Sequence, residues 1–142
     1  MKPIKDTELL LNEIKETASI YEFLENNSSS LLDRPMGDYL DLLLKKYQMN
    51  KTKLQYEAGF SRQYLYEVYS GAKKMSRNKV LNIVFSLHTT LVEAQNLLKY
   101  SGNSQLYAKD MKDSILIFCI QKKMSLIEVN DILFELAIDT LE

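Results

Sequence analysis

Two glycines, Gly59 and Gly71, limit how the middle of the chain can fold, because each follows a short segment of helical composition. A glycine at a helix C-terminus can adopt the left-handed conformation that other residues adopt only at a cost, and the chain then turns tightly. Asn50 and Ser61 precede the two segments, and both residue types commonly cap helix N-termini. The pattern predicts two short helices joined by a three-residue turn, over residues 51–58 and 61–70.

Each predicted helix carries one apolar face. Leu54 and Ala58 are four residues apart in the first, and Leu65 and Val68 share a face with the turn residue Phe60 in the second. The rest of the second helix presents residues that can make polar contacts, namely Arg62, Gln63, Tyr66 and Glu67. One face packs and the other is free, which is the geometry that places the second of two such helices in a DNA major groove.

Residues 36–100 resemble the helix-turn-helix domain of the phage-repressor-like, XRE-type transcription regulators. The order of segments matches: a preceding helix (MGDYLDLLLKKYQM), the motif, a basic exit (SGAKKMSRNKV) and two further helices (KVLNIVFSLHT and LVEAQNLLKYSG). Family members place glycine at the turn, then a hydrophobic residue, then Ser or Asp, then aliphatic residues along the recognition helix. These places are filled here by Gly59, Phe60, Ser61, Leu65 and Val68. The resemblance implies an all-α fold: a repressor-like DNA-binding domain of about five helices, with an N-terminal helix and a C-terminal helical pair.

The sequence departs from the family at Gln55. Members usually have alanine four residues before the turn glycine, where the two helices touch. A longer polar side chain there widens the helix crossing or extends outward. The interpretation that competes with DNA binding is an αα-hairpin within a helical bundle that binds no nucleic acid.

Charge is unevenly distributed along the chain. The 18 basic and 19 acidic residues give a formal net charge of -1, which argues against a protein that coats nucleic acid generally. Residues 36–80, however, hold nine basic and four acidic residues, a net +5, whereas residues 1–35 and 81–142 each sum to −3. Lysines beside a recognition helix neutralise phosphates, although lysines also simply keep a surface solvated.

The predicted base contacts lie on the second helix. An arginine fork matches the O6 and N7 acceptors of guanine and a glutamine amide matches adenine, so Arg62 and Gln63 in the first turn are the leading candidates. One turn later, Tyr66 suits a thymine methyl or a phosphate, and Glu67 suits a cytosine amino group. The alternative for the tyrosines of this helix is packing at its border. The predicted phosphate contacts are Lys51, Thr52, Ser61, Lys73, Lys74 and Arg77.

Composition predicts a compact all-helical chain. The 142 residues are 46% hydrophobic and include only four glycines and two prolines, so helices are rarely interrupted. No apolar run reaches the length of a membrane span, and the first residues lack the apolar core of a signal peptide. A single cysteine fits a reducing compartment, so we expect a cytoplasmic protein.

The N-terminal region, residues 1–27, is predicted to be an amphipathic helix. Apolar residues recur from Asp6 to Asn26 with acids between them, at Leu10, Ile14, Tyr21 and Leu24. The sequence leaves open whether this helix packs on its own chain or on a protein partner. Residues 28–35 are predicted to be a short linker.

The C-terminal region, residues 105–142, is predicted to be a second unit, a helical pair. The run from Ile115 to Ile120 suits a buried strand by its β-branched content, but its polar flanks favour a helix with one buried face, formed by Met111, Ile115 and Phe118. Ser125 and Glu128 form a capping box, as Thr90 and Glu93 do earlier. An apolar stripe follows, formed by Val129, Ile132, Leu133 and Leu136. This pair is either a homodimer interface or ordinary core.

The residues expected of an enzyme are missing from the pattern. His88, the one histidine, ends an apolar helical run, and Cys119 lies inside the most hydrophobic segment. No glycine-rich phosphate loop and no histidine-based metal spacing occur, so we expect no catalysis, metal or cofactor. Two hypotheses remain. The first is a dimeric, sequence-specific regulator of transcription that binds double-stranded DNA and acts as a repressor. The second is a protein-binding adaptor that retains the helix-turn-helix scaffold and works through its helical flanks.

Overall fold

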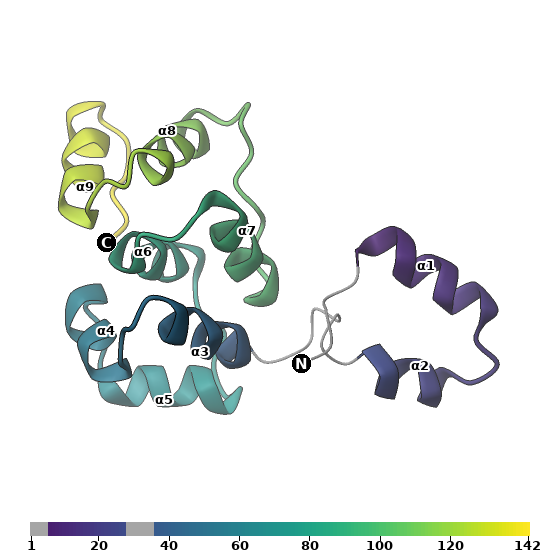
Figure 1. The fold of residues 1–142 in the computed structure, drawn as a ribbon. Coiled ribbons are helices and arrows are strands. Elements are labelled where there is room, and N and C mark those ends of the chain that lie inside the picture. Colours follow the sequence, from purple (N-terminus) through teal and green to yellow (C-terminus); the bar gives the residue numbers. More distant parts are fainter. Residues whose placement is uncertain (1–5, 28–35) are drawn as a thin grey trace. The chain divides into compact units, whose positions relative to one another are not determined.

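The computed structural model describes residues 6–27 and 36–142, which belong to two compact units (Figure 1). Within these residues the regular structure consists of α-helices alone, which confirms the all-α class. The helices are α1 Thr7–Glu16, α2 Ile20–Asn27, α3 Met36–Lys46, α4 Lys51–Ala58, α5 Arg62–Ser70, α6 Arg77–Leu87, α7 Leu91–Tyr100, α8 Met111–Gln121 and α9 Leu126–Glu135.

The smaller unit contains α1 and α2, which contact each other. The prediction of one helix over residues 6–26 is therefore wrong, because the chain leaves the helix after Glu16. Thr17 is extended, with φ −73° and ψ 140°, and its hydroxyl donates to the Ser19 carbonyl at 3.1 Å. The Ser19 hydroxyl in turn accepts from the Glu22 N–H at 3.4 Å. Short polar side chains have taken over hydrogen bonds that would otherwise continue the helix.

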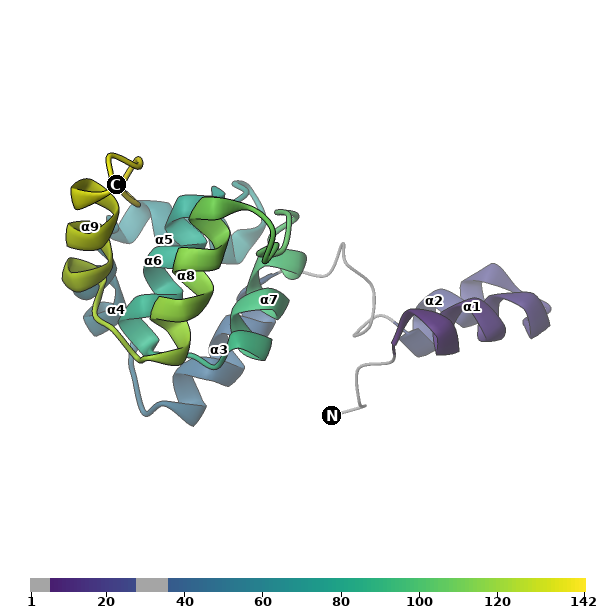
Figure 2. The ribbon, with the colours of Figure 1, turned by 90° about the horizontal axis from the view of Figure 1, so that it is seen from above.

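The larger unit is built around α6. Six of its residues are buried, namely Val80, Leu81, Ile83, Val84, Phe85 and Leu87. This helix contacts α4, α7 and α9, while α3 contacts α5 and α7. Figures 1 and 2 place α8 above α6, with α9 on one side and α7 on the other. These six residues give α6 a wide apolar face, which has to lie inside the unit because its exposure would leave apolar surface in water.

A buried carboxylate joins the end of α3 to the start of α7. Glu93 Oε2 accepts from Lys46 Nζ at 2.6 Å, and Oε1 accepts from the Tyr47 hydroxyl. The Thr90 N–H also donates to Oε1, at 2.9 Å, which completes the predicted capping box. Burial alone would raise the pKa of Glu93, but the hydrogen bonds from Lys46 and Tyr47 outweigh burial and lower the pKa to about 2. The carboxylate is therefore ionised at neutral pH.

The run from Ile115 to Ile120 is helical, as its polar flanks predicted, but the predicted buried face is wrong. Met111 is 65% exposed and Phe118 is 49% exposed, whereas the buried apolar side chains of α8 are those of Leu116, Cys119 and Ile120. Six consecutive apolar residues contain no polar position that would mark the outer face, so periodicity could not select the inner one.

Helix α9 begins at the predicted capping box of Ser125 and Glu128. Within the predicted apolar stripe, Val129 and Leu133 are buried, while Leu136 follows the helix and is exposed. Both α8 and α9 lie in the same compact unit as α3–α7 and share its core. Residues 105–142 are therefore not a separate unit, and core packing is the arrangement observed for this helical pair.

The predicted linker, residues 28–35, lies outside the residues that the structure describes. Among the helices in the described ranges, none is both long enough and apolar enough to span a bilayer.

Candidate nucleic-acid interface

The turn between α4 and α5 has the conformation predicted from its residue types. Asn50 Oδ1 accepts from the Lys53 N–H at 2.8 Å, so it caps α4, and Ser61 Oγ accepts from the Tyr64 N–H at 3.0 Å, so it caps α5. Gly59, at φ 75°, ends α4 in the left-handed region. Gly71, at φ 84°, ends α5 in the same way. Local sequence thus fixes both ends of both helices.

The inner faces of α4 and α5 are packed against the rest of the unit. Their buried residues are Leu54, Ala58, Leu65 and Val68. Behind α5, Gly37 of α3 lies against the ring of Tyr69, where an added Cβ would stand 2.7 Å from Tyr69 Cδ1. The absence of a side chain at Gly37 allows α3 to approach α5 closely and support it from behind.

The outer face of α5 carries the predicted base contacts. Arg62, Gln63 and Tyr66 are exposed, with Tyr66 at 68%, and Glu67 is partly buried. Gln63 Nε2 donates to Glu67 Oε1 at 3.0 Å, and Lys73 Nζ lies 3.1 Å from Glu67 Oε2. These hydrogen bonds, first that from Gln63 and then that from Lys73, lower the pKa of Glu67. Gln63, Glu67 and Lys73 form one exposed polar cluster, while Arg62 lies outside it.

A hollow of about 240 Å³ opens beside the turn. Its lining includes Ser61, Gln63, Glu67 and Lys73, together with Lys79 of α6. The Lys79 ammonium lies 3.9 Å from the centroid of the Tyr64 ring, which holds it next to the start of α5 by a cation–π contact. Sequence reasoning did not select Lys79 as a contact residue. Only the packing of α6 against α4 brings this lysine to the turn.

A second hollow, of about 510 Å³, lies between α4 and α5. It is lined by Lys51, Thr52, Gln55, Arg62, Leu65, Tyr66 and Tyr69. The Lys51 ammonium stands 4.0 Å from the Tyr69 ring centroid and 3.9 Å from Asp41 Oδ1. The predicted base contact Arg62 and the predicted phosphate contacts Lys51 and Thr52 therefore share one concave surface.

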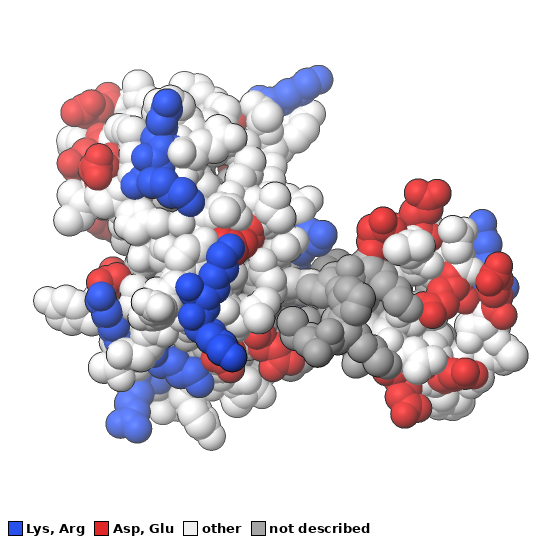
Figure 3. Space-filling model, in the orientation of Figure 1, with Lys and Arg blue, Asp and Glu red and all other residues white. Residues whose placement is uncertain are grey.

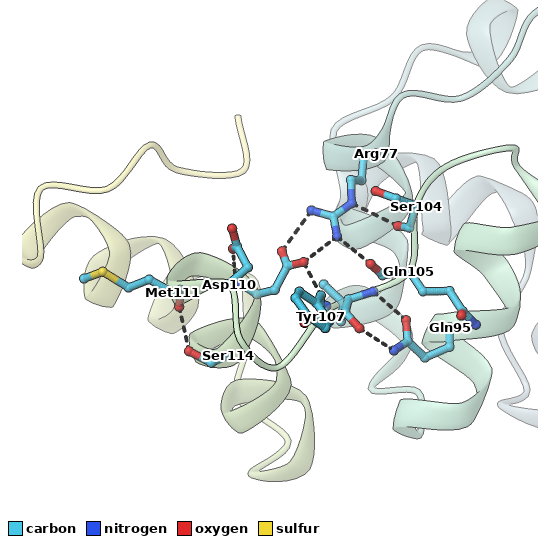
Figure 4. Close-up of polar contacts among 10 residues, drawn as sticks. Arg77, Gln95, Ser104, Gln105, Tyr107, Asp110, Met111 and Ser114 are labelled. Atoms are coloured by element: carbon cyan, nitrogen blue, oxygen red, sulfur yellow. Dashed lines mark hydrogen bonds and ion pairs between the residues drawn. The ribbon is translucent and has the colours of Figure 1, made fainter.

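Arg77 is not available as a phosphate contact. Its Nη1 and Nη2 donate to the two carboxylate oxygens of Asp113 at 2.9 Å each, and Nε and Nη2 also donate to the carbonyls of Ser104 and Gln105 (Figure 4). Burial would raise the pKa of Asp113, but the Arg77 hydrogen bonds outweigh it and lower the pKa. Arg77 instead joins α6 to α8 and to the segment before it, because a planar guanidinium matches the Asp113 carboxylate in two bonds.

The remaining predicted phosphate contacts, Lys51, Thr52, Ser61, Lys73 and Lys74, are all exposed. Figure 3 shows Lys and Arg side chains gathered over the lower part of the larger unit, where α3, α4 and α5 lie, and mostly acidic side chains on the smaller unit. On the face shown, the basic side chains are thus most numerous on the part of the surface formed by the basic segment of the sequence.

The two residues considered for catalysis lie away from these hollows. His88 follows α6 in the left-handed conformation, at φ 54°, as the helix-end residue that its position indicated. Cys119 is buried in the core, and burial raises the pKa of its thiol.

Comparison of the chain with protein-family models, with curated proteins and with solved structures finds no match in any of the three.

Proposed function

We propose that this protein is a sequence-specific DNA-binding regulator of transcription that inserts α5 into the major groove. The observation that carries the proposal is the outer face of α5. Arg62, Gln63 and Tyr66 are exposed there on a helix whose two ends and inner face are fixed by caps, left-handed glycines and core packing. A rigid helix with exposed polar side chains is what direct reading of base edges requires.

The surroundings of α5 suit phosphate binding. The exposed residues Lys51, Thr52, Ser61, Lys73 and Lys74 stand at the start of α4, at the turn and just after α5. Contacts of this kind fix the position of a protein on the duplex without selecting sequence. Reading of bases is therefore assigned to Arg62, Gln63, Tyr66 and Glu67, and positioning to the lysines and hydroxyls.

A second copy of the chain is proposed to bind through α9. Ile127 and Phe134 are seven residues apart, hence on one face of this helix, and are 75% and 78% exposed. Exposed apolar residues on one face mark a protein interface. A dimer would read a two-fold symmetric site with half-sites about one helical turn apart. Because Phe134 is so exposed, Phe134→Glu should shift the sedimentation coefficient to that of a monomer while the chain keeps its helical circular dichroism. A dimer that persists would place the interface elsewhere.

The test of the proposed function is selection of bound duplexes from a random pool by the full chain at near-physiological salt. Enrichment of one site is expected, and no enrichment would contradict the proposal. On the enriched site, Arg62→Ala should cost roughly 1–3 kcal/mol and relax preference at one base pair. Lys74→Ala is the matched comparison, because loss of a phosphate contact weakens binding to all duplexes almost equally.

A second candidate function is that of a protein-binding adaptor. The specific observation in its favour is the smaller unit, which exposes large apolar side chains on both of its helices. Failure to enrich any duplex, with binding that is weak and salt-sensitive on every sequence, would favour this candidate.

A further inference from the structure

We propose that Gln55 is a specificity-determining residue, which reads a base edge through the hollow between α4 and α5, beside the contact made by Arg62. The inference rests on the proposed function and adds a base contact from the first helix of the motif. Gln55 is one of the residues that line this hollow, together with Arg62 and Tyr66.

The Gln55 amide is unpartnered. Among the described residues, none donates to or accepts from its side chain, although its backbone carbonyl accepts from Gly59 and Phe60. The residue is half-buried, yet both amide atoms remain accessible to solvent. A polar group that is partly enclosed and has no partner is suited to a partner supplied by a ligand.

Gln63 differs from Gln55 in the hydrogen bonding of its side-chain amide. Its amide already donates to Glu67 at 3.0 Å, so reading a base would first require that bond to be broken. Gln55 has no such protein partner to release, and its half-buried position limits the rotamers lost on binding. Of the two glutamines of the motif, Gln55 is the better prepared to donate and accept at a base.

Packing alone gives no reason for an amide at this position. The buried side chains of α4 and α5 are apolar, and a small apolar residue would fill a helix crossing without exposing a polar group. The chemistry of an amide matches adenine, whose N6 donates and whose N7 accepts. The base that Gln55 reads is therefore expected to be an adenine next to the base pair read by Arg62.

The experiment uses the full chain and the duplex that it enriches from a random pool. Every base pair of that duplex is varied in turn, and competition binding is measured for the wild type, Gln55→Ala and Gln55→Glu. In Gln55→Ala, the ratio of affinities for the preferred and the substituted base pair should fall about tenfold at one A·T pair and stay unchanged at the other pairs. Gln55→Glu can only accept, so its preference at the same pair should move from adenine to cytosine.

The control is Gln121→Ala, which removes an exposed amide at the end of α8 and should leave the whole preference profile unchanged. Thermal unfolding of each variant verifies that it is folded. Gln55→Ala should remain folded, because alanine has the highest helix propensity of all residues. A change of preference at one pair supports base reading by Gln55. A loss that is equal at every pair overturns it, because that result indicates a role in setting the helix crossing.

The two proposals fail in different ways. If the wild type enriches a site and Gln55→Ala has the wild-type profile, the inference on Gln55 is overturned and the proposed function stands. If the wild type enriches no site while remaining folded, both are overturned.

Discussion

The two compact units differ in how they use their apolar side chains. In the larger unit, 27 buried apolar residues from seven helices, the segments between them and the segment after α9 form one cluster. Among residues 6–27 of the smaller unit, Phe23 is the buried apolar residue, and six large apolar side chains are exposed, those of Leu9, Leu11, Ile14, Ile20, Tyr21 and Leu24. Amphipathic sequence is present in both units, but among the described residues it is covered only in the larger one.

This difference in apolar burial indicates that tertiary packing stabilises the helices of this protein. Helices of eight to eleven residues, such as those described here, are marginal in water and depend on tertiary packing. The helices of the larger unit have that packing, and those of the smaller unit have little. Residues 6–27 also hold six acidic residues and one lysine, a net −5, opposite in sign to the DNA-binding surface proposed above.

The largest expected effect is on the core of the larger unit. Leu98 of α7 is fully buried, so Leu98→Ala removes packed methyl groups and leaves a cavity. We expect a loss of about 2–5 kcal/mol in the free energy of unfolding, measured by urea denaturation. A loss below about 1 kcal/mol would mean that this core is loosely packed.

Acid should weaken the same unit through Glu93. Its pKa is about 2 in the folded chain against an ordinary 4.5, so its stabilisation is complete above pH 4.5 and is lost as the pH falls toward 2. We expect this contribution to be about 2 kcal/mol, allowing for the exposed position of Lys46. Urea unfolding at several pH values is to be compared with Glu93→Gln, whose stability should vary less over this interval. Parallel pH profiles would contradict the assignment.

A smaller effect is expected at the contact between α3 and α5. Gly37→Ala forces the Tyr69 ring to move, because the new Cβ would stand 2.7 Å from Cδ1. Overpacking of this kind lowers the free energy of unfolding by about 1–3 kcal/mol. The higher helix propensity of alanine offsets up to about 1 kcal/mol of this loss. Tyr69→Leu in the same chain should reduce the penalty. If Gly37→Ala lowers the free energy of unfolding equally in the wild type and in the Tyr69→Leu chain, the Tyr69 ring is not the source of the strain.

The smallest effect is expected in the smaller unit. Leu11→Ala removes a side chain that is 54% exposed, so the change in Tm should correspond to no more than about 0.5 kcal/mol. The same substitution is made in Leu98→Ala. The ratio of the two losses of stability measures how much more the larger unit depends on its packed apolar side chains. Similar losses would show that the apolar face of α1 is covered in solution.

Most element boundaries in the larger unit follow from local residues. Asn50, Gly59, Ser61 and Gly71 mark the ends of α4 and α5 because capping and left-handed glycine act over three or four residues. The break after Glu16 was missed, although Thr17 and Ser19 are residues that compete for backbone hydrogen bonds. Their effect is small enough that the apolar periodicity on both sides concealed it.

The candidate interface was predictable only in part. Exposure of Arg62, Gln63 and Tyr66 follows from their helical positions, since the opposite face carries Leu65 and Val68. The pairing of Arg77 with Asp113 could not be read from sequence, because the partners are 36 residues apart and meet only through the packing of α8. Lys79 reaches the turn for a similar reason, through the placement of α6.

The sequence by itself determined the all-helical class, the caps, and the turn that orients α5, because these depend on neighbouring residues. Tertiary structure decided which face of α8 is buried, that α8 and α9 join the core, and which lysines and arginines remain free. Those outcomes depend on contacts between residues distant in sequence, where burial of apolar surface and pairing of a buried charge outweigh local preference.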